Sequence, residues 1–226
     1  MNRPRLVEVR ENILKQNDLL ARSLRTRFHE AGVLVVSFVS SPGSGKTTLL
    51  EKLLARASEK FRIAALVGDL ATENDAARLM RAAPQVKQIT TGTVCHLDAH
   101  MVELALANWE LNKLDLLFIE NVGNLVCPSS YDLGEDLRFV LLSATEGEDK
   151  PLKYPTIFNT SDVAIITKMD LAAAAEFDVE LAHRNIQSVR PGMRVFELSA
   201  KTGKGIDELS SFIQSQRLVS QSEAAV

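Results

Sequence analysis

Cysteine is scarce in this chain, with Cys95 and Cys127 the two such residues among 226. An excess of one charge is also missing: the net charge of −3 gives no electrostatic reason to expect nucleic acid or an anionic membrane as a partner. No apolar run approaches the ~18 residues of a transmembrane helix, and no apolar segment follows the basic first residues as in a signal peptide. We therefore expect a cytoplasmic protein whose two thiols serve metal or redox chemistry rather than a disulfide.

Internal repeats and long linkers are absent too, and the length suits one large α/β domain. Apolar positions at near-helical spacing predict an amphipathic helix within 1–32, packed on the domain and ended by Gly32. Over 33–217, short apolar runs alternate with helical patterns, which predicts a mostly parallel sheet with helices on both faces. A polar tail at 218–226 is expected to be flexible. The expected strands are 33–39, 61–67, 86–90, 114–119, 138–143, 162–167 and 194–198, and the further helices are 47–59, 73–82, 96–111, 172–189 and 205–216.

A glycine-rich segment joins the first expected strand to the helix at 47–59. It reads Ser-Ser-Pro-Gly-Ser-Gly-Lys-Thr-Thr over residues 40–48, with Ser40 where the usual pattern has glycine. This order of strand, loop, Gly-Lys-Thr and helix is typical of the phosphate-binding loop of P-loop NTPases, in which Lys46 reaches the β- and γ-phosphates and Thr47 binds Mg²⁺. The residues expected to hold the phosphates are Pro42, Gly43, Ser44, Gly45, Lys46, Thr47 and Thr48.

Two acidic residues, Asp69 and Glu120, end expected strands. Because the carboxyl ends of parallel strands meet at one edge of the sheet, we expect both to lie near the phosphate-binding loop. Both are candidate Mg²⁺ ligands. Asp75 is a third candidate, but it also sits where a helix starts and could be a solvated acid of the first turn.

The segment Glu120-Asn121-Val122-Gly123 resembles the D-x-x-G switch of GTPases, with glutamate replacing aspartate. Gly123 is expected to turn its N–H toward a γ-phosphate, which would make residues 121–134 sensitive to the nucleotide. Asn124, rather than a catalytic glutamine, follows Gly123. We therefore expect hydrolysis that rests on Lys46 and Thr47, with slow intrinsic turnover.

The motif Thr167-Lys168-Met169-Asp170 resembles the N-K-x-D sequence that recognises guanine. In that motif the lysine packs along the base and the aspartate accepts hydrogen bonds from guanine N1–H and the exocyclic amine, a donor pair that adenine lacks. Further on, Ser199, Ala200 and Lys201 match the S-A-K segment that lines the guanine site. Together the two motifs favour GTP over ATP.

Cys95 is followed directly by His96, and His100 lies four residues further on. On a helix the two histidines would share one face. Cys127 lies on the nucleotide-sensitive segment. Thiolates and imidazoles suit Zn²⁺ or Ni²⁺, although two ordinary thiols and two surface histidines would give the same spacing.

These motifs closely resemble the nickel-insertion GTPases of [NiFe]-hydrogenase maturation, the HypB family, and the resemblance runs from about residue 8 to residue 215. It is carried by SSPGSGKTTLLEKL (40–53), GDLATENDAARL (68–79), TTGTVCHLDAHM (90–101), LLFIENVGNLVCPSSYDLGED (116–136), EGEDKPLKYP (146–155) and IITKMD (165–170).

The resemblance implies a GTPase that dimerises, binds nickel or zinc, and works with a small zinc-containing protein, HypA, to deliver nickel to the hydrogenase large-subunit precursor. It maps the metal ligands onto Cys95, His96 and Cys127, with His100 as a further candidate. The N-terminal cysteine motif and histidine-rich stretch of some members have no counterpart here, so nickel chemistry is expected within 33–217.

Several alternatives stay open at this point. Lys150 and Lys153 either reach the nucleotide of a second subunit or are solvated loop residues, and Asp98 either supports a histidine ligand or starts a helix. For the whole protein, the rivals are a urease accessory GTPase, whose E-S-G-G-D-N and C-P-H motifs fit less well, a nucleotide-regulated metal buffer, and a small-molecule P-loop kinase.

Overall fold

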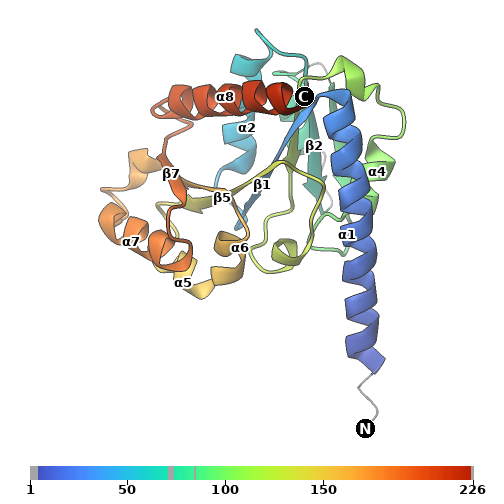
Figure 1. Ribbon diagram of the computed structural model, residues 1–226. Helices are drawn as coiled ribbons and strands as arrows, with labels where there is room; N and C mark the ends of the chain where they lie inside the picture. Colours follow the sequence, from blue (N-terminus) through green and yellow to red (C-terminus); the bar gives the residue numbers. More distant parts are fainter. Residues whose placement is uncertain (1–4, 71–73, 84, 225–226) are drawn as a thin grey trace.

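Seven parallel strands form one sheet in the order β3-β2-β4-β1-β5-β6-β7 in the described part of the chain (Figure 1). The structure, a computed structural model, describes residues 5–70, 74–83 and 85–224, with the backbone alone at 5–10, 74 and 220–224. All seven strands predicted from the sequence are present, within two residues at each end. Their bounds are β1 (Leu34–Ser40), β2 (Ile63–Asp69), β3 (Gln85–Thr90), β4 (Leu116–Glu120), β5 (Leu137–Ser143), β6 (Val163–Thr167) and β7 (Arg194–Glu197).

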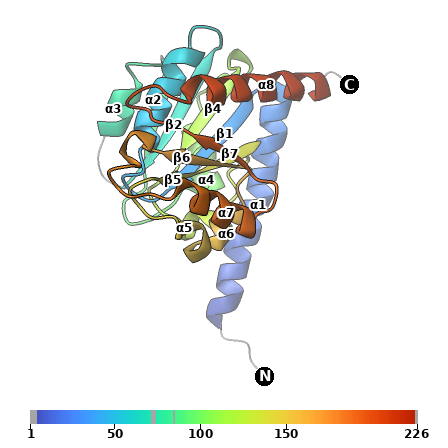
Figure 2. The same cartoon turned by 90° about the vertical axis from the view of Figure 1, so that its left-hand side faces the viewer.

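Helices cover both faces of this sheet, as predicted (Figures 1 and 2). One face packs on α2 (Lys46–Ala57), α3 (Asn74–Leu79) and α8 (Ile206–Ala224). The other face packs on α1 (Arg5–Ala31), α4 (Ala99–Ala105), α6 (Pro155–Asn159) and α7 (Val179–Val189). Short helical segments complete the chain: η1 (Leu111–Lys113), η2 (Cys127–Ser130), α5 (Lys150–Lys153) and η3 (Met169–Leu171).

The central strand β1 is apolar on both faces because it is covered on both. Phe38 packs on the α2 side, where its ring lies 5.4 Å from the rings of Phe118 and of Phe139 in edge-on contact. Val35 and Val39 point to the opposite side. Burying each such side chain stabilises the fold by about 1.5–3 kcal/mol, so β1 is firmly held in the sheet.

The strand order places the site at the carboxyl end of β1. The chain passes from β1 over β4 to reach β2, and β5 pairs with the other edge of β1. Ligands of open α/β sheets bind where the strand order reverses in this way. Four strands, β1, β2, β4 and β6, end at this edge of the sheet. Their last residues are Ser40, Asp69, Glu120 and Thr167, respectively.

Two helices begin later than their sequence pattern suggests. The predicted helix 96–111 is instead α4, capped by Asp98, whose carboxylate accepts a hydrogen bond from the N–H of Met101 at 2.8 Å. The predicted helix 172–189 is instead α7, capped in the same way by Asp178. In both cases the capping carboxylate satisfies backbone N–H groups of the first turn and so sets the start of the helix.

Other boundaries also differ from the predictions. The expected flexible tail at 218–226 is helical through Ala224 as the end of α8, and residues 225–226 lie outside the described part. The predicted helix 73–82 is shorter as α3, with residue 73 outside the described part. Short helices α5 and α6, each with a proline in its first two positions, were not predicted at all, because they are too short to show a helical period.

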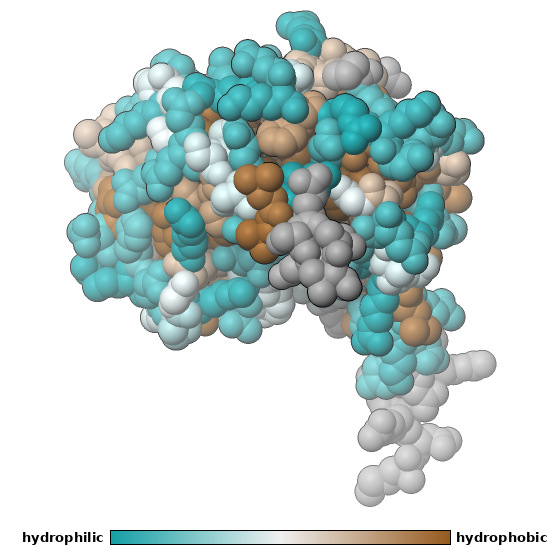
Figure 3. Space-filling view, turned by 45° about the horizontal axis from the view of Figure 1, so that its top comes forward, coloured by the Kyte–Doolittle hydropathy of each residue, from teal (hydrophilic) through white to brown (hydrophobic). Residues whose placement is uncertain are grey.

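The N-terminal helix α1 packs on the domain with its C-terminal half, where Ala21, Leu24 and Phe28 are fully buried. Its N-terminal half projects beyond the sheet and the other helices (Figures 1 and 2). Seen from the α8 side, the surface is mostly hydrophilic with separate apolar patches (Figure 3). Each helix of the described residues is too short or too polar to cross a bilayer.

Candidate functional site

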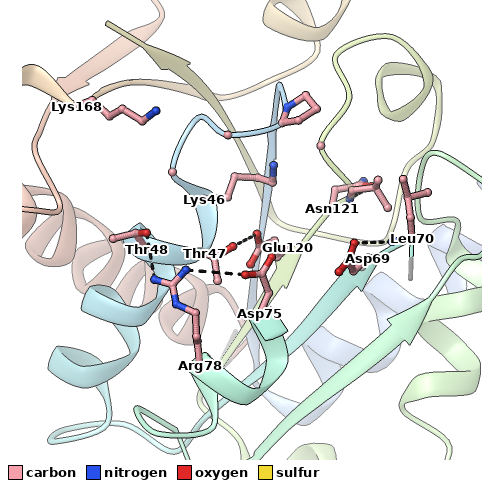
Figure 4. A pocket seen from close by; sticks show the side chains of 16 residues that line it. Lys46, Thr47, Thr48, Asp69, Leu70, Asp75, Arg78, Glu120, Asn121 and Lys168 are labelled. Carbon is pink, nitrogen blue, oxygen red and sulfur yellow. Dashed lines mark hydrogen bonds and ion pairs between the residues drawn. The ribbon is translucent and has the colours of Figure 1, made fainter. Parts of the chain in front are cut away.

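A cavity of 480 Å³ opens at the carboxyl end of β1, between the loop before α2 and the ends of β2 and β4 (Figure 4). Gly43 and Gly45 in that loop have φ of 74° and 93°, a region that favours glycine over other residues. Gly45 caps α2, which turns the free N–H groups at the start of this 12-residue helix toward the cavity. Such a helix start with its loop N–H groups is suited to bind phosphate.

Lys46 is buried in this cavity, and its Nζ donates a hydrogen bond to the Ser40 hydroxyl at 2.8 Å. Loss of water lowers the pKa of Lys46, while the nearby carboxylates, Glu120 first among them, oppose that shift. Ser40, the departure from the usual glycine pattern, therefore holds the lysine in place. The sequence shows that Ser40 departs from the usual pattern, but it does not predict the hydrogen bond to Lys46. No local sequence pattern indicates that two side chains six residues apart in a loop will meet.

Glu120 lies at the bottom of the cavity, 3% exposed, and its Oε1 accepts a hydrogen bond from Thr47 Oγ1 at 2.8 Å. Its Oε2 is buried and has no hydrogen-bond partner among the described residues. Burial raises the pKa of Glu120 to about 7. A buried carboxylate oxygen beside a threonine hydroxyl fits a hard divalent cation such as Mg²⁺.

Asp69 and Asp75 line the same cavity as Glu120, so the structure brings together the three carboxylates predicted as Mg²⁺ candidates (Figure 4). Asp69 Oδ1 accepts from the N–H of Leu70 at 2.6 Å. Asp75, on α3, lies 3.9 Å from Arg78 across one helical turn.

Arg78 was missed by the analysis of the sequence, although it belongs to the GDLATENDAARL segment. It lines the cavity, and its Nη2 donates to Thr48 Oγ1 at 3.2 Å and to Glu51 at 2.9 Å. It thus fastens α3 to the first turns of α2. The sequence around Arg78 does not predict these contacts, because they depend on how α3 packs on α2.

Gly123 lies directly against the phosphate-binding loop. A Cβ at this position would come within 2.8 Å of the Cα of Pro42, closer than real Cβ atoms approach. Both residues line the cavity. The glycine therefore allows the predicted nucleotide-sensitive segment, residues 121–134, to touch the phosphate-binding loop.

A second cavity of 220 Å³ adjoins the first, beside the ends of β6 and β7. Lys168 lines both cavities, with a φ of 57° that is unusual for a residue other than glycine. Asp170 Oδ1 accepts a hydrogen bond from Ser199 Oγ at 2.5 Å. The base-recognition candidates therefore meet here: Lys168, Asp170, Ala200 and Lys201 line this cavity, and Ser199 holds Asp170.

Cys95, His96 and Cys127 form a cluster in which one ligand atom of each lies within 4.8 Å of the others. The two Sγ atoms are 2.8 Å apart. His96 Nδ1 is buried without a hydrogen-bond partner among the described residues, and loss of water lowers the pKa of His96, which favours the neutral imidazole. Thiols beside a neutral imidazole suit a borderline or soft divalent metal. Tyr131 stacks on the imidazole, with ring centroids 4.0 Å apart.

His100 does not join this cluster, and the prediction that it shares a helical face with His96 is wrong. Asp98 starts the helix after His96, so only His100 is helical. The His100 side chain is 65% exposed and lies 3.9 Å from Glu103.

Local contacts are made by the three residues whose roles the sequence left undecided, Lys150, Lys153 and Asp98. Lys153 pairs with Asp149, and Lys150 lies over the ring of Tyr154. Neither lysine is among the residues lining the two cavities. Asp98 acts as the cap of α4.

Comparison with known proteins decides the family. The family model described as CobW/HypB/UreG, nucleotide-binding domain, matches residues 34–197. The chain belongs to the CobW/HypB/UreG family. The resemblance to HypB seen in the sequence is confirmed by its relatives: hydrogenase maturation factor HypB of Azotobacter chroococcum mcd 1 is 44% identical over 217 residues, which cover 96% of this chain and 71% of that protein.

Further relatives and solved structures support the same family. The hydrogenase/urease maturation factor HypB of Helicobacter pylori is 43% identical over 92% of this chain and 86% of that protein. The crystal structure of HypB from Helicobacter pylori in complex with nickel superposes with a TM-score of 0.85 at 42% identity, covering 89% of this chain and 95% of that one. HypB from Archaeoglobus fulgidus gives 0.84 at 38% identity, covering 90% and 99%. These matches also confirm the P-loop α/β fold.

Proposed function

We propose that this chain is a GTPase that carries nickel and assists its insertion into the precursor of the [NiFe]-hydrogenase large subunit. One observation supports this above all: the segment that lines the phosphate cavity from Glu120 to Gly123 also carries Cys127 of the metal cluster. That segment begins at Glu120 in the cavity and reaches Cys127 seven residues later. Nickel is the cargo in this proposal, and zinc is the alternative ion for the same ligands.

GTP is the proposed nucleotide because of the second cavity. Asp170 would accept hydrogen bonds from guanine N1–H and the exocyclic amine, and Lys168 would pack along the base. Ser199 orients Asp170 through its 2.5 Å hydrogen bond. Adenine would leave the aspartate without a donor pair, which disfavours ATP.

Hydrolysis would rest on positioning and charge. Lys46 and the loop N–H groups of Gly43 to Thr48 would bind the phosphates, with Gly123 N–H on the γ-phosphate side. Thr47 and Glu120 would hold Mg²⁺, joined directly or through water by Asp69 and Asp75. Mg²⁺, when bound, neutralises charge on the phosphate oxygens. Asn124 takes the place of a water-orienting glutamine, so turnover would be slow.

The proposed partners follow from the family. We propose a homodimer linked by metal or GTP, a HypA-type zinc protein, and the hydrogenase precursor, in the cytoplasm. The Helicobacter relatives are named for urease as well as hydrogenase, so urease precursor is the competing client. The domain unit would be 33–217, with α1 as an attached element.

Nickel titration of the purified chain with GTP and Mg²⁺ present tests the proposal. We expect one thiolate-to-nickel absorbance band that disappears in Cys95→Ala and Cys127→Ala. Phosphate release from GTP, absent in Lys46→Ala, completes the test. Nickel binding that ignores both thiols would refute the metal assignment. Unchanged nickel delivery to a hydrogenase precursor by Lys46→Ala would favour a metal buffer, and a phosphorylated small-molecule acceptor would favour a kinase.

A further inference from the structure

Asparagine side chains join the two loops that carry the Cys95, His96 and Cys127 cluster. One loop is residues 91–98, between β3 and α4, and the other is the switch segment, residues 121–134. Asn121 and Asn124 on the switch segment each bond to the first loop, and Asn17 of α1 bonds to the start of α4 and to the switch segment. These contacts fix where the thiols and the imidazole lie relative to each other.

Asn121 also belongs to the phosphate cavity. It follows Glu120 directly, lines the cavity and is 2% exposed. Its Oδ1 accepts hydrogen bonds from the N–H of Leu97 at 3.0 Å and from the N–H of Val122 at 2.9 Å. Leu97 follows His96, so one carboxamide touches both the nucleotide cavity and the metal loop.

Leu97 has a second contact with the phosphate cavity. It is fully buried, and its side chain packs on Gly68 so closely that a Cβ there would come within 2.8 Å of Leu97 Cγ. Gly68 lines the cavity and precedes Asp69. Leu97, the residue after His96, therefore contacts two residues that line the phosphate cavity, Asn121 and Gly68.

Asn17 differs from Asn121 in one useful respect. Its Oδ1 accepts from the N–H of Ala99 at 2.9 Å, and its Nδ2 donates to the carbonyl of Asp132 at 2.9 Å. It therefore ties the start of α4, directly after the first loop, to the switch segment, but it lies on α1 and is not among the residues lining the phosphate cavity.

We propose that Asn121 is the positioning residue that couples nucleotide state to metal affinity, a proposal that rests on the function given above. A γ-phosphate that draws Gly123 inward moves the backbone beside Asn121. The Asn121 carboxamide then either moves together with the N–H of Leu97 or loses their hydrogen bond. The second response leaves the buried N–H of Leu97 unsatisfied, which costs free energy. Either response shifts His96 and Cys95 relative to Cys127. By linkage, metal bound at the cluster changes nucleotide affinity by the same factor.

The experiment measures the nickel Kd of the full chain with GDP and with a non-hydrolysable GTP analogue, in wild type, Asn121→Ala and Asn17→Ala. For wild type we expect the two Kd values to differ by about fivefold or more, the range usual for coupled sites. In Asn121→Ala we expect the ratio to fall to about one while nickel and nucleotide still bind. In Asn17→Ala both Kd values rise together and the ratio stays as in wild type, because this contact is remote from the nucleotide.

The reverse measurement provides an independent readout. Affinity for a fluorescent GTP analogue is compared with and without nickel, and the wild-type factor should vanish in Asn121→Ala alone. If that variant fails to fold, Asn121→Ser replaces it, because it keeps a small polar side chain in the buried position but lacks the carboxamide that accepts from the N–H of Leu97. We expect Asn121→Ser to reduce the ratio as well.

The outcomes separate this proposal from the function on which it rests. Nickel that fails to bind through the two thiols, or GTP that fails to bind, overturns the function itself. Nickel and GTP that both bind to wild type with one common nickel Kd overturn the coupling only. Full coupling retained in Asn121→Ala, or in Asn121→Ser when it is used instead, also overturns it and leaves the GTPase intact.

Discussion

Thr167 Oγ1 donates a hydrogen bond to the backbone carbonyl of Ser44 at 2.7 Å. This contact joins the base-recognition motif to the phosphate-binding loop, two segments more than a hundred residues apart in the chain. Thr167 stands where the guanine motif usually has asparagine, and it is 3% exposed. The hydroxyl therefore holds the two halves of the nucleotide site together.

Thr167→Val should weaken GDP binding. The change keeps the shape of the side chain but leaves the buried Ser44 carbonyl without this donor, at a cost of about 1–3 kcal/mol. Titration with a fluorescent GDP analogue should show a Kd raised about fivefold or more. Thr160→Val is the matched control, because that hydroxyl lies on a helix end away from both cavities. Equal Kd values for the two variants would contradict this role.

Asp170→Asn should change the base preference. The amide presents a donor to guanine N1–H or the exocyclic amine, so GTP affinity should fall by at least about a hundredfold. Xanthine carries an oxygen in place of that amine, and XTP should bind the variant better than GTP does. Competition against the fluorescent nucleotide measures both. A variant that still prefers GTP would show that Asp170 does not read the base.

Glu120 should make the nucleotide-free chain less stable as pH rises from about 4.5 to about 7. Burial raises the pKa of this carboxyl in the folded state to about 7, from its ordinary value of 4.5. The folded state therefore holds a proton that the unfolded state releases, so its contribution is complete below 4.5 and is lost toward 7. The difference between the pKa of Glu120 in the folded and unfolded states corresponds to about 3 kcal/mol in the free energy of unfolding.

Denaturant unfolding without Mg²⁺ or nucleotide at pH 5 and pH 7.5 measures this effect in wild type and Glu120→Gln. The glutamine variant should lose less stability over that interval by a few kcal/mol, since it has no proton to release. Identical pH dependence of the two proteins would mean that Glu120 titrates normally. Mg²⁺ added at pH 7.5 should stabilise wild type and not the variant, because the cation needs the carboxylate.

His100→Ala should leave nickel affinity unchanged, whereas His96→Ala should lower it at least tenfold. The physical reason is position: His96 lies with both thiols, while the His100 side chain, on α4, is outside that cluster and exposed. Nickel titration monitored by thiolate absorbance compares the two variants, which remove the same group from neighbouring places. A loss of affinity in His100→Ala would contradict this geometry.

Regular features of the site could be predicted from local sequence. The Gly-Ser-Gly-Lys-Thr run after an apolar strand located the phosphate-binding loop, and Asp69 and Glu120 were placed because parallel strands end at one edge. Contacts between distant side chains could not be predicted. The bonds of Ser40 to Lys46 and of Asn121 to Leu97 depend on how loops approach each other, and no periodicity records that.

The sequence by itself determined the α/β class, the parallel strands and the family, because apolar period and short motifs are local properties of the chain. Only the tertiary structure decided which histidine joins the cysteines. His96 and His100 look equivalent in sequence, but the Asp98 carboxylate starts α4 between them by binding the N–H of Met101. That cap leaves His96 in the loop beside Cys95 and Cys127 and turns His100 toward solvent.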